Sequence, residues 1–181
     1  MKKSLAWVGC NISNSVAASY RASIVPMLYR RYLPEDFNAL YAIEEACFQP
    51  PFRFGRRYMR QLVEIPNAAT WIAELDGRMV GFAIVDWTGE SEMVAAYIQT
   101  IEVMPSGRGR GVAGNLLARI EGSAQAARAR VIWLHVDAGN VGAIRLYEAS
   151  GYLREGREEN YYPRGRPALV YYKSLESMPA V

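Results

Sequence analysis

The sequence is poor in the residues that build metal centres and disulfide frameworks. Its 181 residues include one histidine and two cysteines. Cys10 and Cys47 have neither the spacing of a zinc site nor the number that a disulfide framework requires. His135 alone cannot form a histidine-rich metal site. We therefore expect no metal and a reduced, cytoplasmic protein.

A large charge of one sign is also missing. The 21 basic and 18 acidic residues leave a net charge of +3. Nucleic-acid binding requires a basic patch, which so small a surplus does not indicate. Apolar residues make up 51% of the chain and charged residues 22%, which excludes a disordered protein. We expect a globular protein with no nucleic-acid partner.

The sequence also lacks an apolar run long enough to cross a membrane, for which about 20 predominantly apolar residues are needed. The apolar stretch from Leu5 to Val8 follows two lysines, but it is short and is soon interrupted by Asn11. We therefore do not interpret it as a secretory signal. We expect residues 1–24 to be a poorly ordered extension, residues 25–176 a single domain, and residues 177–181 a short tail.

Within this domain, strand-like and helix-like patterns alternate without a linker or a repeat. Strands are predicted at 27–33, 70–75, 79–86, 93–103, 131–136, 152–160 and 168–174. Helices are predicted at 34–47, 56–64, 111–129 and 140–150. Segment 131–136 is almost wholly apolar, so we expect a strand that is buried on both faces. The pattern predicts one mixed α/β domain.

The most informative segment lies between the fourth predicted strand and the third predicted helix. It reads Pro105-Ser106-Gly107-Arg108-Gly109-Arg110-Gly111-Val112-Ala113. Glycines let a backbone approach a ligand closely, and the N–H groups at a helix start bind anions. Arginine side chains suit phosphate oxygens. The segment lacks both the Gly-Lys-Ser/Thr of a Walker loop and the Gly-x-Gly-x-x-Gly order of a dinucleotide fold. It predicts a phosphate-binding loop of another kind.

Arg108-x-x-Gly111-x-Ala113 resembles the pyrophosphate-binding signature of the GNAT acetyltransferases. Asn140-x-x-Ala143-x-x-Leu146-Tyr147, followed by Gly151-Tyr152, is similar to the second cofactor segment of that family. The resemblance covers about residues 27–175 and implies the GNAT acyl-CoA N-acyltransferase fold, a mixed sheet of about seven strands with flanking helices. It also implies acetyl-CoA as co-substrate. The implied cofactor-binding residues are Ile101, Glu102, Val103, Arg108, Gly109, Arg110, Gly111, Val112, Ala113 and Asn140. Gly107 departs from the family pattern, in which an aromatic residue is common here.

Two further segments resemble Nα-terminal protein acetyltransferases of the RimI-like and NatE types. They are Trp133-Leu134-His135-Val136 and Asn160-Tyr161-Tyr162-Pro163. RimI-like enzymes carry a glutamate at the position of His135, whereas NatE-type subunits carry a histidine paired through water with a tyrosine on the preceding strand. Tyr97 matches that tyrosine. The resemblance implies direct acetyl transfer, in a ternary complex, to the α-amino group of a protein or peptide N-terminus.

The residues suggest roles in this chemistry. An α-amine has a pKa near ~8, so a histidine with an unperturbed pKa near ~6.5 suits its deprotonation. His135 is therefore the principal candidate for the general base, and Tyr97 is expected to position a water. Glu102 is the alternative base, although we expect a solvated side chain at the strand end. The resemblance implies that the Tyr147 hydroxyl lies near the sulfur of CoA, where it donates a proton to, or hydrogen-bonds with, the leaving thiolate.

The acceptor side is less specific. The resemblance places Phe48 and Pro50 in the loop that cups the first substrate residue, and Tyr161 and Tyr162 over the peptide backbone. Two alternatives remain open. In the first, the acceptor is a small amine, such as a polyamine, an amino acid or an antibiotic. In the second, the protein is a non-catalytic acyl-CoA-binding module. The sequence does not indicate an oligomeric state.

Overall fold

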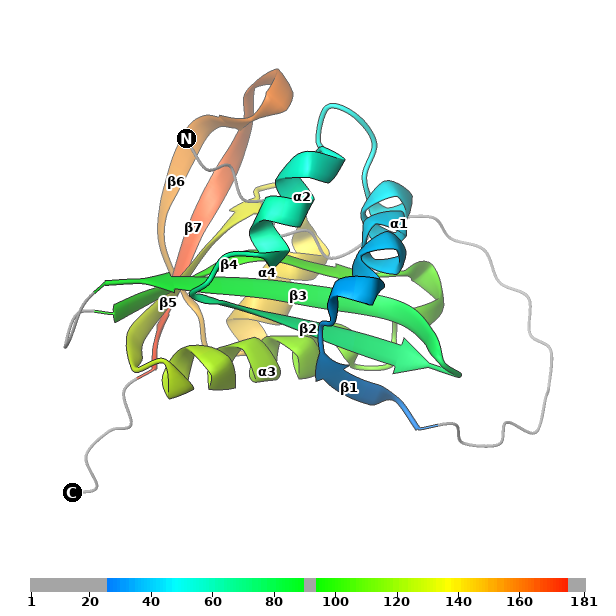
Figure 1. Cartoon of the computed structure of the whole chain (residues 1–181). Coiled ribbons are helices and arrows are strands. Elements are labelled where there is room, and N and C mark those ends of the chain that lie inside the picture. Colours follow the sequence, from blue (N-terminus) through cyan, green and yellow to red (C-terminus); the bar gives the residue numbers. More distant parts are fainter. Residues whose placement is uncertain (1–25, 90–93, 176–181) are drawn as a thin grey trace.

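A computed structural model describes residues 26–89 and 94–175, which form one seven-stranded sheet flanked by helices (Figure 1). The predicted extension at 1–24 and the predicted tail at 177–181 lie outside the described residues. The strands are β1 (Leu28–Arg31), β2 (Ala68–Leu75), β3 (Arg78–Thr88), β4 (Val94–Val103), β5 (Ala129–Asp137), β6 (Leu153–Tyr162) and β7 (Arg166–Ser174). The helices are α1 (Phe37–Cys47), α2 (Arg56–Val63), α3 (Val112–Ala126) and α4 (Val141–Ala149).

The sheet has the order β1-β2-β3-β4-β5-β7-β6. Neighbouring strands are antiparallel except for β4 and β5, which are parallel. The predicted mixed α/β fold is confirmed, and the predicted elements are found in order. The third helix ends earlier than predicted, at Ala126, because Arg128 adopts a positive φ of 62° and β5 begins at Ala129.

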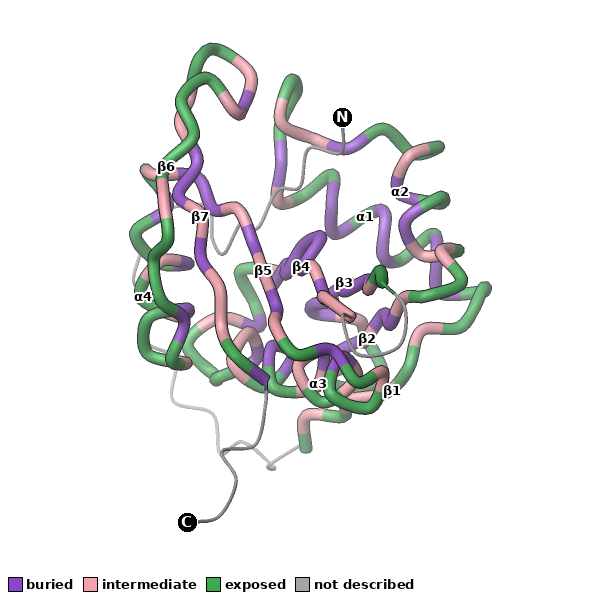
Figure 2. The backbone as a smooth tube through the Cα atoms, turned by 90° about the vertical axis from the view of Figure 1, so that its left-hand side faces the viewer, coloured by how far each residue is buried: buried purple, intermediate pink, exposed green. Residues whose placement is uncertain are grey.

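Helices cover both faces of the sheet. The core between the sheet, α3 and α4 includes Ile98, Ile101 and Leu116, and the core under α1 and α2 includes Phe37 and Phe82. Figure 2 shows the buried residues concentrated in the central strands, whereas β6 is largely exposed. Because side chains alternate along a strand, β4 sends Ile101 towards α3 and Glu102 towards α1.

The prediction that the fifth strand is buried on both faces is wrong for one face. Ile132, Leu134 and Val136 are fully buried against the α3 side, but Trp133 and His135 on the other face are only partly buried. The physical reason is the position of α1 and α2, which pack on β2, β3 and β4 and leave this face of β5 more open.

The sheet divides between β4 and β5. These strands pair only near their starts, from Val94 with Ala129 to Tyr97 with Trp133. Beyond this point β4 follows β3 to Val103, while β5 follows β7 to Asp137. A register shift opposite Ile84 and Val85 leaves Gln99 as an extra residue in β4. The two strands therefore diverge, with Tyr97 at the vertex.

Gly81 on β3 provides a test of the packing beside this division. A Cβ atom there would lie 2.7 Å from the main-chain oxygen of Glu102. We expect Gly81→Ala to lower the free energy of unfolding by about 1–3 kcal/mol, because backbone must move. Gly156→Ala is the control, since a Cβ at Gly156 meets nothing within 4 Å. Denaturant unfolding measures both, and equal effects would contradict the packing described.

Candidate active site

A cavity lies beside the end of β4 and the start of α3. Its volume is about 300 Å³. The residues that line it are Val103, Gly107, Arg108, Gly109, Gly111, Val112, Ala113, Gly114 and Leu146. Most of the glycine-rich segment is therefore brought together with α4, in agreement with the order of the two sequence motifs. Arg110, the other arginine of the segment, is exposed.

The backbone of this loop depends on two of its glycines. Gly109 and Gly111 have φ values of 69° and 73°, a left-handed conformation that side chains disfavour. Gly111 is the residue before the first turn of α3, whose N–H groups face outward from the helix start. The Arg108 side chain folds back, and its Nε donates to the Val103 carbonyl at 3.2 Å. The loop thus offers main-chain donors and a positive helix end.

Gly107 is explained by packing. A Cβ atom at this position would lie 3.1 Å from Val103 Cγ1 and 3.3 Å from the main-chain oxygen of Val80. The residue is buried between these two valines, so an aromatic side chain would not fit without movement of the loop.

The other expected cofactor residues contribute differently. The Ile101 side chain is buried in the core on the α3 side, so only its main chain is available to a ligand. Asn140 caps α4, since its Oδ1 accepts a hydrogen bond from the Ala143 N–H at 3.1 Å. Its buried Nδ2 has no hydrogen-bond partner within residues 26–89 and 94–175.

Tyr147 lies on the inner face of α4 and is fully buried. Its ring meets that of Tyr152 edge to face, with centroids 5.5 Å apart. Among the described residues the Tyr147 hydroxyl has no hydrogen-bond partner. Burial raises the pKa of this hydroxyl above its usual value, so it stays protonated. A buried donor without an acceptor in the protein is well suited to an acceptor atom of a ligand.

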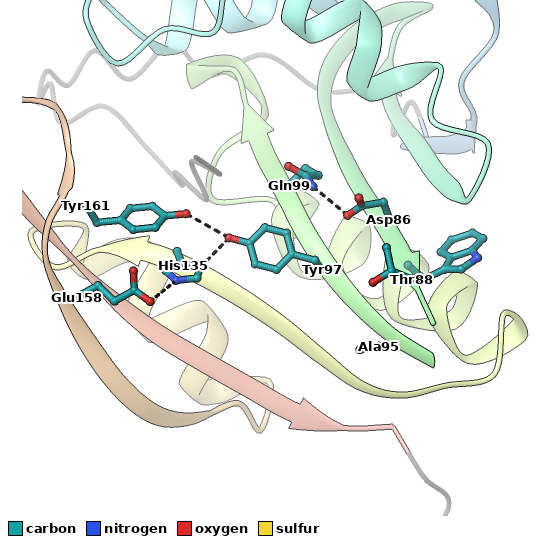
Figure 3. Close-up of a pocket in the computed structure, with 9 residues that line it drawn as sticks. Asp86, Thr88, Ala95, Tyr97, Gln99, His135, Glu158 and Tyr161 are labelled. Carbon is teal, nitrogen blue, oxygen red and sulfur yellow. Dashed lines mark hydrogen bonds and ion pairs between the residues drawn. The ribbon is translucent and has the colours of Figure 1, made fainter. Parts of the chain in front are cut away.

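A second cavity, of about 400 Å³, opens on the other face of the sheet at the point where β4 and β5 diverge (Figure 3). The residues that line it are Asp86, Trp87, Thr88, Ala95, Tyr97, Gln99, His135, Glu158 and Tyr161. Among the described residues, this lining includes two carboxyl groups and no lysine or arginine. Asp86 accepts a hydrogen bond from Gln99 Nε2 at 2.9 Å.

Tyr97 and His135 meet directly in this cavity, whereas the resemblance implied a pairing through water. Tyr97 Oη lies 2.7 Å from His135 Nδ1, and His135 Nε2 lies 3.2 Å from Glu158 Oε1. Because a carboxylate only accepts hydrogen bonds, this geometry favours the tautomer with the proton on Nε2. Nδ1 then accepts the proton of the Tyr97 hydroxyl. Hydrogen bonds at both ring nitrogens therefore fix the orientation of the imidazole.

Glu158 was not found from the sequence. It lies on β6, which is separated from β5 by β7, so no local spacing links it to His135. The only available signal was the cluster of acidic residues at Glu155, Glu158 and Glu159, which is typical of an exposed strand edge.

The two tyrosines of the last hairpin differ. The Tyr161 ring stacks on His135 with centroids 4.4 Å apart and an angle of 5° between the rings. Tyr162 is buried, and its hydroxyl donates to the His135 main-chain oxygen at 3.2 Å. In the loop after α1, Pro50 is exposed and Phe48 is buried. Of the four residues expected to contact the acceptor, Tyr161 is therefore the one that lines the cavity.

The expectation that the Glu102 side chain is solvated is wrong, since the residue is 0% exposed. It faces α1, where its carboxyl group meets that of Glu44 and accepts a hydrogen bond from Thr100 Oγ1 at 3.0 Å. Burial, together with the neighbouring Glu44, raises the pKa of Glu102 well above its usual value. The Glu102 side chain faces α1 and lines neither of the two cavities, which is unfavourable for a general base.

Two wider features complete the description. Within residues 26–89 and 94–175, no group of three or more histidine, cysteine, aspartate or glutamate side chains could hold a metal ion. None of the helices in this part of the chain is long and apolar enough to cross a membrane.

Comparison with known proteins places the chain among acetyltransferases. Residues 37–152 match the model of the Acetyltransferase (GNAT) family. The [ribosomal protein bS18]-alanine N-acetyltransferase of Haemophilus ducreyi is 29% identical over 129 residues, which is 71% of this chain and 84% of that protein. The N-terminal acetyltransferase A complex catalytic subunit NAA10 of Arabidopsis thaliana is 26% identical over 149 residues, 81% of this chain and 77% of that protein.

The fold is shared with solved structures. The crystal structure of Arabidopsis thaliana NAA60 in complex with acetyl-CoA superposes with a TM-score of 0.74 at 22% identity, covering 82% of this chain and 99% of that one. The predicted sheet of about seven strands with flanking helices is thus confirmed as the fold of this family.

The raised pKa of Glu102 predicts how stability depends on pH. Between the ordinary glutamate pKa of about 4.3 and the raised value, the folded protein holds a proton that the unfolded chain has lost. The free energy of unfolding therefore falls as pH rises in this range, by at most about 1.4 kcal/mol per pH unit. Glu102→Gln removes this contribution. Urea unfolding at several pH values should therefore show the free energy of unfolding of the variant increasing relative to that of the wild type as pH rises. Exposed Glu64→Gln is the control, and parallel curves for wild type and Glu102→Gln would contradict the assignment.

Proposed function

This chain belongs to the GNAT acetyltransferase family, and from that premise we propose that it transfers the acetyl group of acetyl-CoA directly to the α-amino group of a protein or peptide N-terminus. The observation that carries the proposal is the Tyr97–His135 hydrogen bond of 2.7 Å at the point where β4 and β5 separate. It supports the proposal because His135 Nδ1, a group able to accept a proton, lies beside Tyr97 on the sheet face opposite α3 and α4.

The residues present fit acetyl-CoA, which supplies an activated thioester when bound. The main chain of residues 108–113 would hold its pyrophosphate, in the cavity at the start of α3. The main chain of residues 101–103 would border the thioester, and the Val103 N–H would stabilise the developing oxyanion. The Tyr147 hydroxyl, buried and without an acceptor among the described residues, would hydrogen-bond to the sulfur.

The proton of the acceptor amine leaves through the pair at the vertex. Glu158 holds the Nε2–H of His135, which keeps the Nδ1 lone pair directed at Tyr97 Oη. The amine would give its proton to Tyr97 Oη, directly or through a water that Tyr97 positions, as the Tyr97 hydroxyl passes its own proton to Nδ1. The raised pKa of Tyr147 keeps its hydroxyl protonated, and this hydroxyl would donate a hydrogen bond, or its proton, to the departing thiolate of CoA. One residue thus serves as base and another as acid, on opposite faces of the sheet.

The cavity lining supports an amine acceptor. Asp86 and Glu158 bring carboxyl groups to it, no lysine or arginine among the described residues lines it, and Tyr97 and Tyr161 provide aromatic walls. These features favour a protonated amine on approach. Similarity to a relative named as an N-terminal acetyltransferase subunit and to one named as a ribosomal-protein-alanine N-acetyltransferase supports an α-amine in particular. Phe48, Pro50, Tyr161 and Tyr162 stay the proposed contacts to the first peptide residues.

A small amine is the second candidate, because the acidic and aromatic cavity would also accept a polyamine. A panel of short peptides and free amines, incubated with acetyl-CoA and followed by CoA release, separates the two. We expect saturation by peptides with a free N-terminus and none by peptides blocked at that amine. Saturation by a small amine together with indifference to every peptide would reject the proposal.

Replacement of Tyr147 tests the acid. We expect Tyr147→Phe to lower kcat by about 10²–10⁴-fold, because general acid catalysis contributes about this much. The fold should be retained, since only a hydroxyl without a partner among the described residues is removed. Tyr171→Phe is the matched control, as its buried side chain donates to Glu148 outside both cavities. An unchanged kcat in Tyr147→Phe would contradict the proposed role of Tyr147 as the general acid.

A further inference from the structure

The loop between α1 and α2 is attached to the body of the protein by a buried carboxyl group. Glu44, on α1, is 0% exposed. Its Oε1 accepts a hydrogen bond from the main-chain N–H of Phe54 at 2.6 Å. Phe54 is at the end of the loop that begins at Phe48, so this bond fixes the return of the loop towards α2. No sequence motif pointed to Glu44.

The same carboxyl group meets a second one. Glu102, on β4, is also 0% exposed, and the two carboxyl groups hydrogen-bond to each other. In each of them Oε2 is buried without an N–H or hydroxyl partner in the described residues. Two carboxylates in contact cannot both be ionised in a buried site, so a single proton between them satisfies both.

Few other groups act on this pair. From α1, Cys47 faces Glu102, and its Sγ lies 3.9 Å from the Val103 carbonyl oxygen. From the loop, Arg53 exerts an attraction on Glu44. From β4, the Thr100 hydroxyl donates to Glu102 at 3.0 Å. Within the described residues, no lysine, arginine or histidine side chain lies within hydrogen-bond distance of either carboxyl group. The shared proton therefore reduces the negative charge of the pair.

The location of the pair gives it a role. Glu102 stands between Ile101 and Val103, whose main chain borders the proposed thioester position. Phe54 closes the loop that contains the proposed acceptor contacts Phe48 and Pro50. The pair therefore joins the strand on the cofactor side to the loop on the acceptor side. Burying two carboxyl groups is costly compared with an apolar pair of similar volume, which favours a role beyond packing.

We propose that Glu44 and Glu102 are positioning residues that share one proton and so hold the α1–α2 loop closed against β4, where it forms the acceptor subsite. The identity of the acceptor rests on the proposed function, but the closure of the loop does not. Loss of the shared proton places two negative charges in contact, and Glu44 then moves away from Glu102 and from the Phe54 N–H. The loop opens and acceptor binding weakens.

The sign of the pH dependence follows. Burial raises the pKa of both groups, so the proton is held at lower pH and is lost as pH rises. The KM for the acceptor peptide should therefore increase with pH beyond what titration of the peptide amine explains. The KM for acetyl-CoA should change little, because the pair touches the loop and not the glycine-rich segment.

Three variants test this. Glu44→Gln keeps an acceptor for the Phe54 N–H and supplies an amide N–H in place of the shared proton. Glu44→Leu supplies neither. Glu45→Gln is the control, since Glu45 is an exposed neighbour whose ion pair with Arg53 is on the surface. For each, we would measure kcat and both KM values with an acceptor peptide from about pH 6 to about pH 9, and hydrogen exchange of the Phe54 amide.

In Glu44→Leu we expect the acceptor KM to rise by about tenfold at neutral pH, the value that loss of about 1.4 kcal/mol of binding gives. The acetyl-CoA KM stays unchanged, and the Phe54 amide exchanges faster. In Glu44→Gln we expect a near wild-type KM at neutral pH. The ratio of its KM to that of the wild type should fall as pH rises, because the amide does not titrate; the ratio also cancels titration of the peptide amine.

An equal increase of the acceptor KM in Glu44→Gln and Glu44→Leu would overturn the proposal of a shared proton. So would a ratio of the Glu44→Gln acceptor KM to the wild-type value that stays constant across pH. Unchanged exchange of the Phe54 amide in Glu44→Leu would overturn the positioning of the loop. This last measurement requires no substrate. If peptides prove not to be acceptors, the proposed function fails while the exchange of Phe54 still decides the role of the pair.

Discussion

The separation of β4 from β5 is the constraint on which the site depends. The strands pair as far as Tyr97 and Trp133 and then follow different neighbours, with Gln99 as the extra residue of β4. Parallel strands in a continuous sheet would pair their main-chain groups with each other. Here β4 and β5 are not paired with each other beyond Tyr97 and Trp133, since β4 continues along β3 and β5 along β7.

Each side of the gap has a different chemical character. On the α3 and α4 side lie the glycine-rich loop and the buried, protonated hydroxyl of Tyr147. On the α1 and α2 side lie the Tyr97–His135–Glu158 series and an acidic cavity. This division suits a transfer reaction in which the donor and acceptor approach from opposite faces. The Glu44–Glu102 pair then connects the two sides through β4.

Local patterns predicted much of this arrangement. The glycine-rich loop could be identified because its function depends on consecutive main-chain groups, and the approximate bounds of most elements follow from periodicity. A pairing of Tyr97 with His135 was implied by a resemblance to known enzymes rather than by spacing, and it was expected through water, whereas the structure has a direct hydrogen bond. Glu44 and Glu158 could not be identified, because each acts through a residue that is distant in sequence and on another element. The burial of Glu102 was missed because alternation along β4 does not reveal what covers each face.

The account stands on an α-amine meeting the thioester at the vertex of the gap. The most direct measurement is mass-spectrometric localisation of the acetyl group on a peptide that offers both a free N-terminus and an internal lysine, after incubation of the protein with acetyl-CoA. The account predicts acetylation of the α-amino group and an unmodified lysine side chain. Acetylation confined to the lysine, or absent from the peptide while a free amine in the same mixture is acetylated, would contradict it.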